Sequence, residues 1–269
     1  VEELIKGMLI QSGNDAAVAL AERVADSEEA FVARMNAEAR ALALSNSQFL
    51  NVSGLHRPGH YTSARDLTRL AAVLIRDFPE YYRWYSHREF SYNGITQYNR
   101  NSLLWRGPDV DGMKTGYTRA AGHCLVSSAA RNGMRLIATV LGADSEPART
   151  EATQTLLEHG FGRYETRLLY QANVPTATVR VWLGDADRLP VGLNQDLYLT
   201  LPRGAHNRLT ASATLKDLHA PVWLGQPVGT LRLMLDRNPY AEHPLIALRD
   251  VASGNFLQQA YDRMRQWLR

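Results

Sequence analysis

The stretch Asp111-Gly112-Met113-Lys114-Thr115-Gly116-Tyr117-Thr118 is the most informative segment of this 269-residue sequence. It places a cation, a hydroxyl group and a glycine at consecutive positions. On a β-strand, a peptide lying alongside could hydrogen-bond to the main chain, and the missing Cβ of Gly116 would allow its close approach. Lys114 and Thr115 would then bind the carboxylate end of that peptide. The segment therefore predicts a strand that binds a peptide.

A second signal lies about a hundred residues upstream, in the stretch from Met8 to Ala17. Here a small polar break, Ser12-Gly13-Asn14, interrupts apolar helical sequence. One interpretation is that Asn14 caps the helix that follows it. The other is that Ser12 and Asn14, two positions apart on a turn, both face one cleft. From these residues alone, both interpretations remain open.

The order of the two motifs is informative, because Ser-x-Asn followed later by Lys-Thr-Gly accompanies a Ser-x-x-Lys nucleophile in penicillin-binding proteins and serine β-lactamases. The chain resembles the D-alanyl-D-alanine carboxypeptidases, which are low-molecular-mass penicillin-binding proteins. Beyond about residue 160 it resembles the smaller β domain of that family. The matching stretches are residues 8–17, 93–97, 99–105, 110–118 and 142–145.

The sequence departs from the family pattern in one respect. Lysine occurs only at positions 6, 114 and 216, and the residues three positions earlier are Glu3, Asp111 and Ala213, so no Ser-x-x-Lys is present. The family places that motif several dozen residues before the Ser-x-Asn turn. We therefore expect the nucleophile to precede Val1 and the sequence to be part of a longer protein.

The composition is that of a soluble globular protein, with 45% hydrophobic and 21% charged residues, and the length favours two domains. A net charge of +3, from scattered arginines, gives no indication of nucleic-acid binding. His56 and His60 stand four apart, the spacing of a metal-binding pair on a helix, but Pro58-Gly59 between them argues against a shared helix. We expect no metal site and no cofactor.

The patterning predicts an α+β domain over residues 1–162, with helices around an antiparallel sheet, as in the penicillin-binding and serine β-lactamase fold. Helices are expected at residues 1–12, 14–25, 27–44 and 62–78, and another begins near Ser145. Asn93-Gly94 predicts a hairpin, and apolar runs after residue 110 predict a meander that puts Lys114 on a sheet strand. The aromatic residues Tyr81, Tyr82, Trp84 and Tyr85 are interpreted as core packing.

Residues 163–252 are predicted to form a small all-β domain, because short β-rich runs alternate with glycine and proline. The expected strands are residues 174–183, 196–201, 209–215, 228–235 and 245–251. No catalytic constellation is evident among them.

Residues 253–269 predict an amphipathic C-terminal helix. Its apolar face comprises Phe256, Leu257, Ala260, Tyr261, Met264, Trp267 and Leu268, and its basic face comprises Arg263, Arg265 and Arg269. Docking on the β domain and lying in a membrane interface both produce this pattern. The resemblance favours a membrane-surface anchor through residues 256–269, and with it a periplasmic protein peripheral to the inner membrane.

The resemblance implies a serine-type D-Ala-D-Ala carboxypeptidase that removes the terminal D-alanine from peptidoglycan stem pentapeptides through an acyl-enzyme. It also implies that β-lactam antibiotics such as penicillin bind covalently. By position, Ser12 and Lys114 would be catalytic. The substrate would be bound by Asn14, Lys114, Thr115, Gly116, Tyr117, Arg149 and Arg100.

Two other functions remain open. A serine β-lactamase shares the motifs, although the long β-rich segment after Arg163 is not expected of one. A non-enzymatic cell-wall-binding protein would account for the missing Ser-x-x-Lys.

Overall fold

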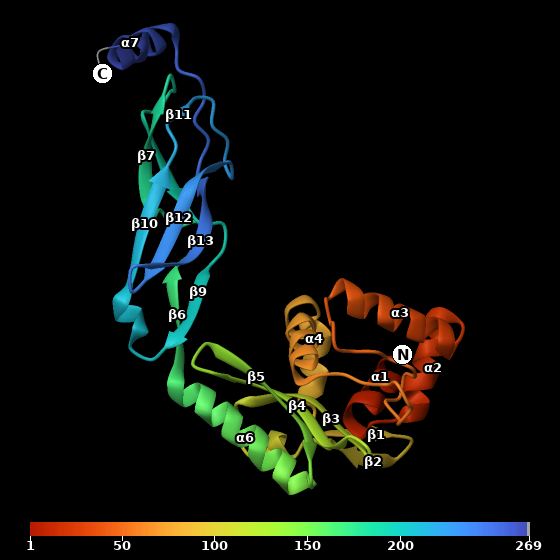
Figure 1. The fold of residues 1–269 in the computed structure, drawn as a ribbon. Helices are drawn as coiled ribbons and strands as arrows, with labels where there is room; N and C mark the ends of the chain where they lie inside the picture. Colours follow the sequence, from red (N-terminus) through yellow and green to blue (C-terminus); the bar gives the residue numbers. More distant parts are fainter. Residues whose placement is uncertain (268–269) are drawn as a thin grey trace. The chain divides into compact units, whose positions relative to one another are not determined.

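The structure is a computed structural model that describes residues 1–267, and the chain divides into two compact units, Val1–Gly162 and Arg163–Arg269. The first contains helices and an antiparallel sheet, and the second is built almost entirely of strands (Figure 1). The predicted α+β class is confirmed. Each unit is described by itself.

The helices of the first unit begin where the sequence provides caps. The Ser27 hydroxyl accepts from Ala30 N at 3.1 Å before α3, and the Ser63 hydroxyl accepts from Asp66 N at 3.2 Å before α4. The prediction of one helix over residues 1–12 is wrong in its second half, where the chain widens into a π-helical turn, η1. The elements are α1 (Glu2–Lys6), η1 (Gly7–Gln11), α2 (Asn14–Ala25), α3 (Glu28–Ala41), α4 (Ala64–Asp77) and α5 (Pro79–Tyr82).

The central sheet is the predicted meander, with strand order β3-β4-β5 and antiparallel pairing throughout. Asn132 and Gly133 between β4 and β5 both have positive φ, at 51° and 76°, as a tight hairpin turn requires. The Asn93-Gly94 hairpin is also present, as β1 and β2. The strands are β1 (Glu89–Tyr92), β2 (Ile95–Tyr98), β3 (Val110–Thr118), β4 (Gly122–Arg131) and β5 (Met134–Ala143).

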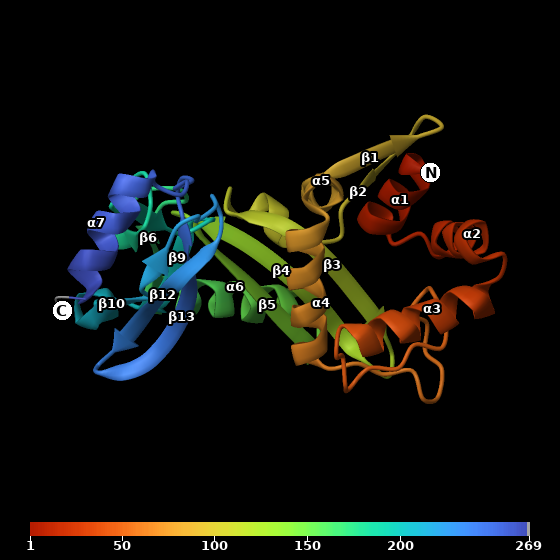
Figure 2. The same cartoon turned by 90° about the horizontal axis from the view of Figure 1, so that it is seen from above.

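The sheet lies between α4 on one face and α6 (Glu146–Arg163) on the other (Figure 2). Towards α6, Leu125 of β4 belongs to a buried cluster with Leu157 and Phe161. Towards α4, Met113 of β3 packs with Ala71 and Tyr82. The sheet that contains the Lys-Thr-Gly strand is therefore packed on both faces.

The aromatic residues of α5 and of the short turn that follows it, η2 (Arg83–Ser86), pack against the sheet, as predicted, with Tyr82 and Trp84 buried and Tyr85 stacked on Tyr82 at 5.7 Å between ring centroids. Tyr81 is the exception, because about half of its surface is exposed. Another short helical turn, η3 (Ser102–Trp105), precedes β3.

Buried polar groups fix the first residues of β3. The carbonyl oxygen of Gly112 accepts hydrogen bonds from Asn101 Nδ2 at 3.0 Å and from Ser127 Oγ at 2.8 Å, and both side chains are fully buried. Beside it, the Tyr82 hydroxyl donates to Asp111 Oδ1 at 2.7 Å. A one-residue shift of β3 would leave these groups unpaired, so they set its register.

The second unit contains a six-stranded sheet of order β10-β12-β13-β8-β7-β11 and a two-stranded sheet of β6 and β9. Its core includes Val181, Leu189, Leu233 and Leu245. The sequence did not predict β6 or β8, and it placed the last strand too late. The elements are β6 (Tyr164–Tyr170), β7 (Ala177–Trp182), β8 (Arg188–Gly192), β9 (Leu197–Pro202), η4 (Ala205–Arg208), β10 (Leu209–Leu215), β11 (Leu218–His219), β12 (Pro227–Leu235) and β13 (Asn238–Ala247).

The predicted C-terminal helix is present as α7 (Phe256–Trp267). Leu268 and Arg269, which the sequence also assigns to it, lie outside the described residues.

We expect Gly112→Ala to lower the free energy of unfolding by about 1–3 kcal/mol, the usual cost of overfilling a packed core. A Cβ at Gly112 would lie 2.7 Å from the Tyr82 hydroxyl oxygen and 3.3 Å from Tyr85 Cβ. The matched control is Gly107→Ala, whose Cβ meets no atom within 4 Å and should cause no loss. Urea unfolding of the intact protein measures both. Equal midpoints for the two variants would contradict tight packing at Gly112.

Candidate active site

Ser12 is positioned by the π-helical turn that precedes it. The turn ends at Gln11, Ser12 adopts the left-handed conformation with φ 63° and ψ 43°, and Gly13 N donates to Gly7 O at 3.2 Å. Such a φ is uncommon for a residue with a side chain. This bend interrupts the helical path and turns Ser12 towards strand β3.

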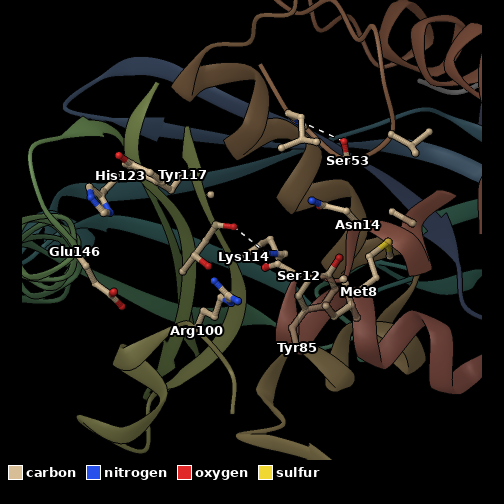
Figure 3. A pocket seen from close by; sticks show the side chains of 18 of the residues that line it. Met8, Ser12, Asn14, Ser53, Tyr85, Arg100, Lys114, Tyr117, His123 and Glu146 are labelled. Atoms are coloured by element: carbon tan, nitrogen blue, oxygen red, sulfur yellow. Dashed lines mark hydrogen bonds between the residues drawn. The ribbon is translucent and has the colours of Figure 1, made fainter. Parts of the chain in front are cut away.

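The capping interpretation of Asn14 is wrong. Asn14 is the first residue of α2, and the N-cap position is occupied by Gly13, which has no side chain to form a cap. The Asn14 amide instead lines the cavity beside Ser12 (Figure 3). Its side chain is therefore available to a ligand.

Lys114 joins the two motifs. Its Nζ donates a hydrogen bond to Ser12 Oγ, 102 positions away in the sequence, and a second one to the carbonyl oxygen of Thr115 at 2.8 Å (Figure 3). The Ser-x-Asn turn and the Lys-Thr-Gly strand thus face each other across one cleft.

The cleft has a volume of about 830 Å³. One wall comes from η1 and the start of α2, another from the loop around Ser53, and β3 provides a third. The lining residues are Met8, Leu9, Ser12, Gly13, Asn14, Ala17, Val52, Ser53, Gly54, Leu55, Tyr85, Arg100, Lys114, Thr115, Gly116, Tyr117, His123, Glu146 and Arg149. Its size is typical of a small-molecule or peptide site.

The cleft is electropositive. Burial, and after it the positive charges of Arg100 and Arg149, lower the pKa of Lys114 from 10.5 to about 8. Arg149 is only 4% exposed, donates to Glu146 Oε1 at 3.1 Å, and has a buried Nε without a hydrogen-bond partner among residues 1–267. Three cations around one cavity favour an anionic ligand, and a carboxylate fits the guanidinium geometry.

All eight residues that the sequence singled out line this one cavity: Ser12, Asn14, Arg100, Lys114, Thr115, Gly116, Tyr117 and Arg149. Sequence reasoning missed the Val52–Leu55 wall, Tyr85, His123 and Glu146. His123 could have been found from the hairpin between β3 and β4, because it is the cross-strand partner of Tyr117. The loop around Ser53 has no periodicity that would have placed it.

Comparison with known proteins identifies the family of the chain. The family model described as D-alanyl-D-alanine carboxypeptidase matches residues 1–145, and the model of the penicillin-binding protein 5 C-terminal domain matches residues 164–253. The D-alanyl-D-alanine carboxypeptidase DacA of Escherichia coli K12 is 43% identical over 268 residues, covering 98% of this chain and 66% of that protein. DacC of the same organism is 42% identical over 274 residues, covering 99% and 68%.

A solved structure is also similar. Penicillin-binding protein 5 from Haemophilus influenzae superimposes with a TM-score of 0.80 at 38% identity, covering 93% of this chain and 74% of that one.

The fold and the two facing motifs define a protein of the penicillin-binding class. The chain belongs to the D-alanyl-D-alanine carboxypeptidase family. It spans 66% of the length of DacA and 68% of the length of DacC.

We expect the Lys114 ammonium to titrate with a midpoint near pH 8, because burial and two arginines disfavour its charge. NMR of ¹³C-labelled lysine measures this directly, since the sequence has only three lysines and Lys114→Met identifies the signal. Arg100→Gln should move the midpoint upwards by removing one of the two charges. A midpoint unchanged in Arg100→Gln would contradict the electrostatic cause.

Proposed function

We propose that the intact protein is a serine-type D-Ala-D-Ala carboxypeptidase, which releases the terminal D-alanine of peptidoglycan stem peptides through an acyl-enzyme and is acylated by β-lactams. The observation that carries this proposal is the hydrogen bond from Lys114 to Ser12 across a cationic cleft, in a chain of this family. These 269 residues contain no Ser-x-x-Lys. The proposal assigns the nucleophile and its activating lysine to protein sequence outside them.

Ser12 would relay a proton. Its hydroxyl accepts from Lys114, so the hydroxyl hydrogen remains free to be donated elsewhere. In acylation, the nucleophilic serine would lose its proton to its own lysine and bond to the penultimate carbonyl carbon. As the C–N bond breaks, Ser12 would pass its proton to the leaving amine nitrogen and take up the proton held by that lysine, and water would later hydrolyse the ester.

Lys114 would act through its charge. A cation here favours the deprotonated form of a neighbouring amine, which the activating lysine needs in order to accept a proton. It would also attract the substrate carboxylate. Arg100 and Arg149 line the same cleft and would add to this second effect.

The remaining lining residues would hold the substrate. Arg149, Arg100 and the Thr115 hydroxyl surround a position suited to the terminal carboxylate, and the unpartnered Nε of Arg149 supports this assignment. Asn14, at the other side of Ser12, would bind the amide on the acyl side. The backbone N–H of Tyr117 would provide half of an oxyanion hole, and Gly116 would let the peptide approach.

Two alternatives lead to different outcomes with penicillin. A β-lactamase would clear the penicilloyl adduct rapidly, whereas a carboxypeptidase would retain it. A non-enzymatic wall-binding protein would form no adduct at all. The match of residues 164–253 to the C-terminal domain of penicillin-binding protein 5 supports the carboxypeptidase function.

We expect Ser12→Ala and Lys114→Met, made in the protein that carries the nucleophile, to slow acylation on the order of 10²-fold or more, because each removes a group that acts in the transition state. Acylation by fluorescent penicillin and release of D-alanine measure the effect. Matched controls are Ser91→Ala on the exposed face of β1 and Lys216→Met in the second unit, both outside the cavity. Wild-type rates in Ser12→Ala and Lys114→Met would exclude both residues from catalysis.

Helix α7 is attached to the β domain by its polar face. Asp262 is only 9% exposed, accepts from Leu183 N at 2.8 Å and lies 3.6 Å from Arg180 Nη2. A reciprocal capping box between Asn255 and Gln258, with two bonds of 2.9 Å, fixes the first turn. The helix therefore has a defined orientation on its domain.

The apolar face of α7 is left uncovered. Positions 256, 257, 260, 264 and 267 lie opposite Asp262 at about 100° per residue. Phe256 is 84% exposed and Trp267 87% exposed. The alternative that α7 docks on the β domain through its apolar face is therefore wrong for the described part of the helix.

We infer that this face lies in a membrane interface, which would make residues 256–269 a peripheral anchor. The family supports a periplasmic protein held in this way on the inner membrane. Phe256, Leu257, Met264 and Trp267 would enter the headgroup region, and Arg263 and Arg265 suit anionic lipid. Among residues 1–267, no helix is long and apolar enough to span a bilayer.

We expect the double variant Phe256→Ser, Trp267→Ser to bind phosphatidylglycerol-containing vesicles about tenfold more weakly or worse, because two large apolar side chains are lost from the interface. Tyr240→Ser, which removes an exposed aromatic of β13, is the control. Vesicle flotation of the intact protein reports binding. Equal flotation of the double variant and wild type would rule out α7 as the anchor.

A further inference from the structure

Tyr117 and His123 form an aromatic pair in the wall of the cleft. They are cross-strand partners on β3 and β4, and their ring centroids lie 4.3 Å apart with the planes tilted by 34°. Cross-strand partners project from the same face of a sheet. Figure 3 shows both rings on the far side of Lys114 from Ser12 and Asn14.

The pair contributes little to the stability of the fold. Tyr117 is 60% exposed, and neither the Tyr117 hydroxyl nor the His123 ring makes a hydrogen bond within residues 1–267. Neither side chain belongs to a buried cluster of the first unit. Two adjacent rings that line a cavity in this way present apolar surface to a ligand.

The position of the pair identifies the part of the substrate that it faces. Under the proposed function, Thr115, Arg100 and Arg149 bind the terminal carboxylate, which belongs to the residue that is released. Thr115 and Tyr117 lie two positions apart on β3 and project to the same side. Asn14 binds the opposite, acyl side of the scissile bond. Tyr117 and His123 therefore stand on the leaving-group side.

We propose that Tyr117 and His123 form the subsite for the side chain of the released residue, and that they determine which terminal D-residues and which β-lactam ring substituents the enzyme accepts. The assignment rests on the proposed function. Flat ring surfaces favour aromatic and large apolar groups in this position over a methyl group. The pair thus extends acceptance beyond D-alanine to larger D-residues.

A pair that served only to pack β3 against β4 would behave differently. Its loss would lower thermal stability and slow the cleavage of all peptides in the same proportion. A leaving-group subsite changes the ratio between two peptides that differ only in their last side chain. That ratio is the readout that separates the two roles.

The test compares acyl-D-Ala-D-Phe with acyl-D-Ala-D-Ala, using kcat/KM for release of the last residue by the protein that carries the nucleophile. We expect His123→Ala and Tyr117→Leu each to lower the D-Phe to D-Ala ratio by about three- to tenfold, the range of a lost aromatic contact. His123→Phe, which keeps a ring, should preserve the ratio. Tyr98→Leu, an exposed aromatic of β2 outside the cavity, is the control and should leave the ratio unchanged.

Each outcome of this comparison supports or overturns the subsite. A ratio that falls in both variants and is kept by His123→Phe supports the subsite. If the wild type releases D-alanine but the variants keep the wild-type ratio, the assignment is overturned while the proposed function stands. If the wild type releases neither residue, the proposed function fails and this assignment fails with it.

Discussion

The hydrogen bond between Lys114 and Ser12 is the contact on which the site depends. It joins a turn near the start of the chain to a strand a hundred residues later, and it brings a cation, a hydroxyl and an amide to one cleft. Neither motif forms the site alone. Without the turn, Lys114 is a cation on a strand with no hydroxyl beside it, and without the strand, Ser12 lies between two helical segments with no cation beside it. The contact gives each residue a chemical partner.

That contact is maintained at a cost to stability. Between about pH 8 and 10.5 the folded protein releases the Lys114 proton while the unfolded chain keeps it, so stability from this group rises with pH across that window. Below pH 8 the penalty of a half-buried cation beside Arg100 and Arg149 is fully present. The buried bonds to the Gly112 carbonyl and the packing of Met113 hold β3 in place against it. Such a balance is typical of functional sites.

The sequence predicted most of the fold because its signals were local. Asn93-Gly94 and Asn132-Gly133 set hairpins, and Ser27 and Ser63 set helix starts. It failed where tertiary structure overrides local preference. The residues of the π-helical turn before Ser12 do not differ in type from those of an ordinary helix, so residues 1–12 were predicted as one helix. His123 was missed because its place in the site comes from pairing with Tyr117, and the sequence analysis did not extend the β3–β4 hairpin to that pair.

Helix α7 illustrates a limit of amphipathic patterns more generally. Periodicity identifies an apolar face and a polar face, but it does not say which one contacts the protein. Here a single buried carboxylate shows which face contacts the protein. Asp262 accepts a hydrogen bond from Leu183 N and lies near Arg180, whose guanidinium stacks on the Trp182 ring at 3.7 Å. Breaking one partner of a buried charged contact is costly, so this face cannot readily exchange with the apolar one. Helix α7 is therefore an oriented part of the β domain, and the exposure of its aromatic rings follows from the burial of one aspartate.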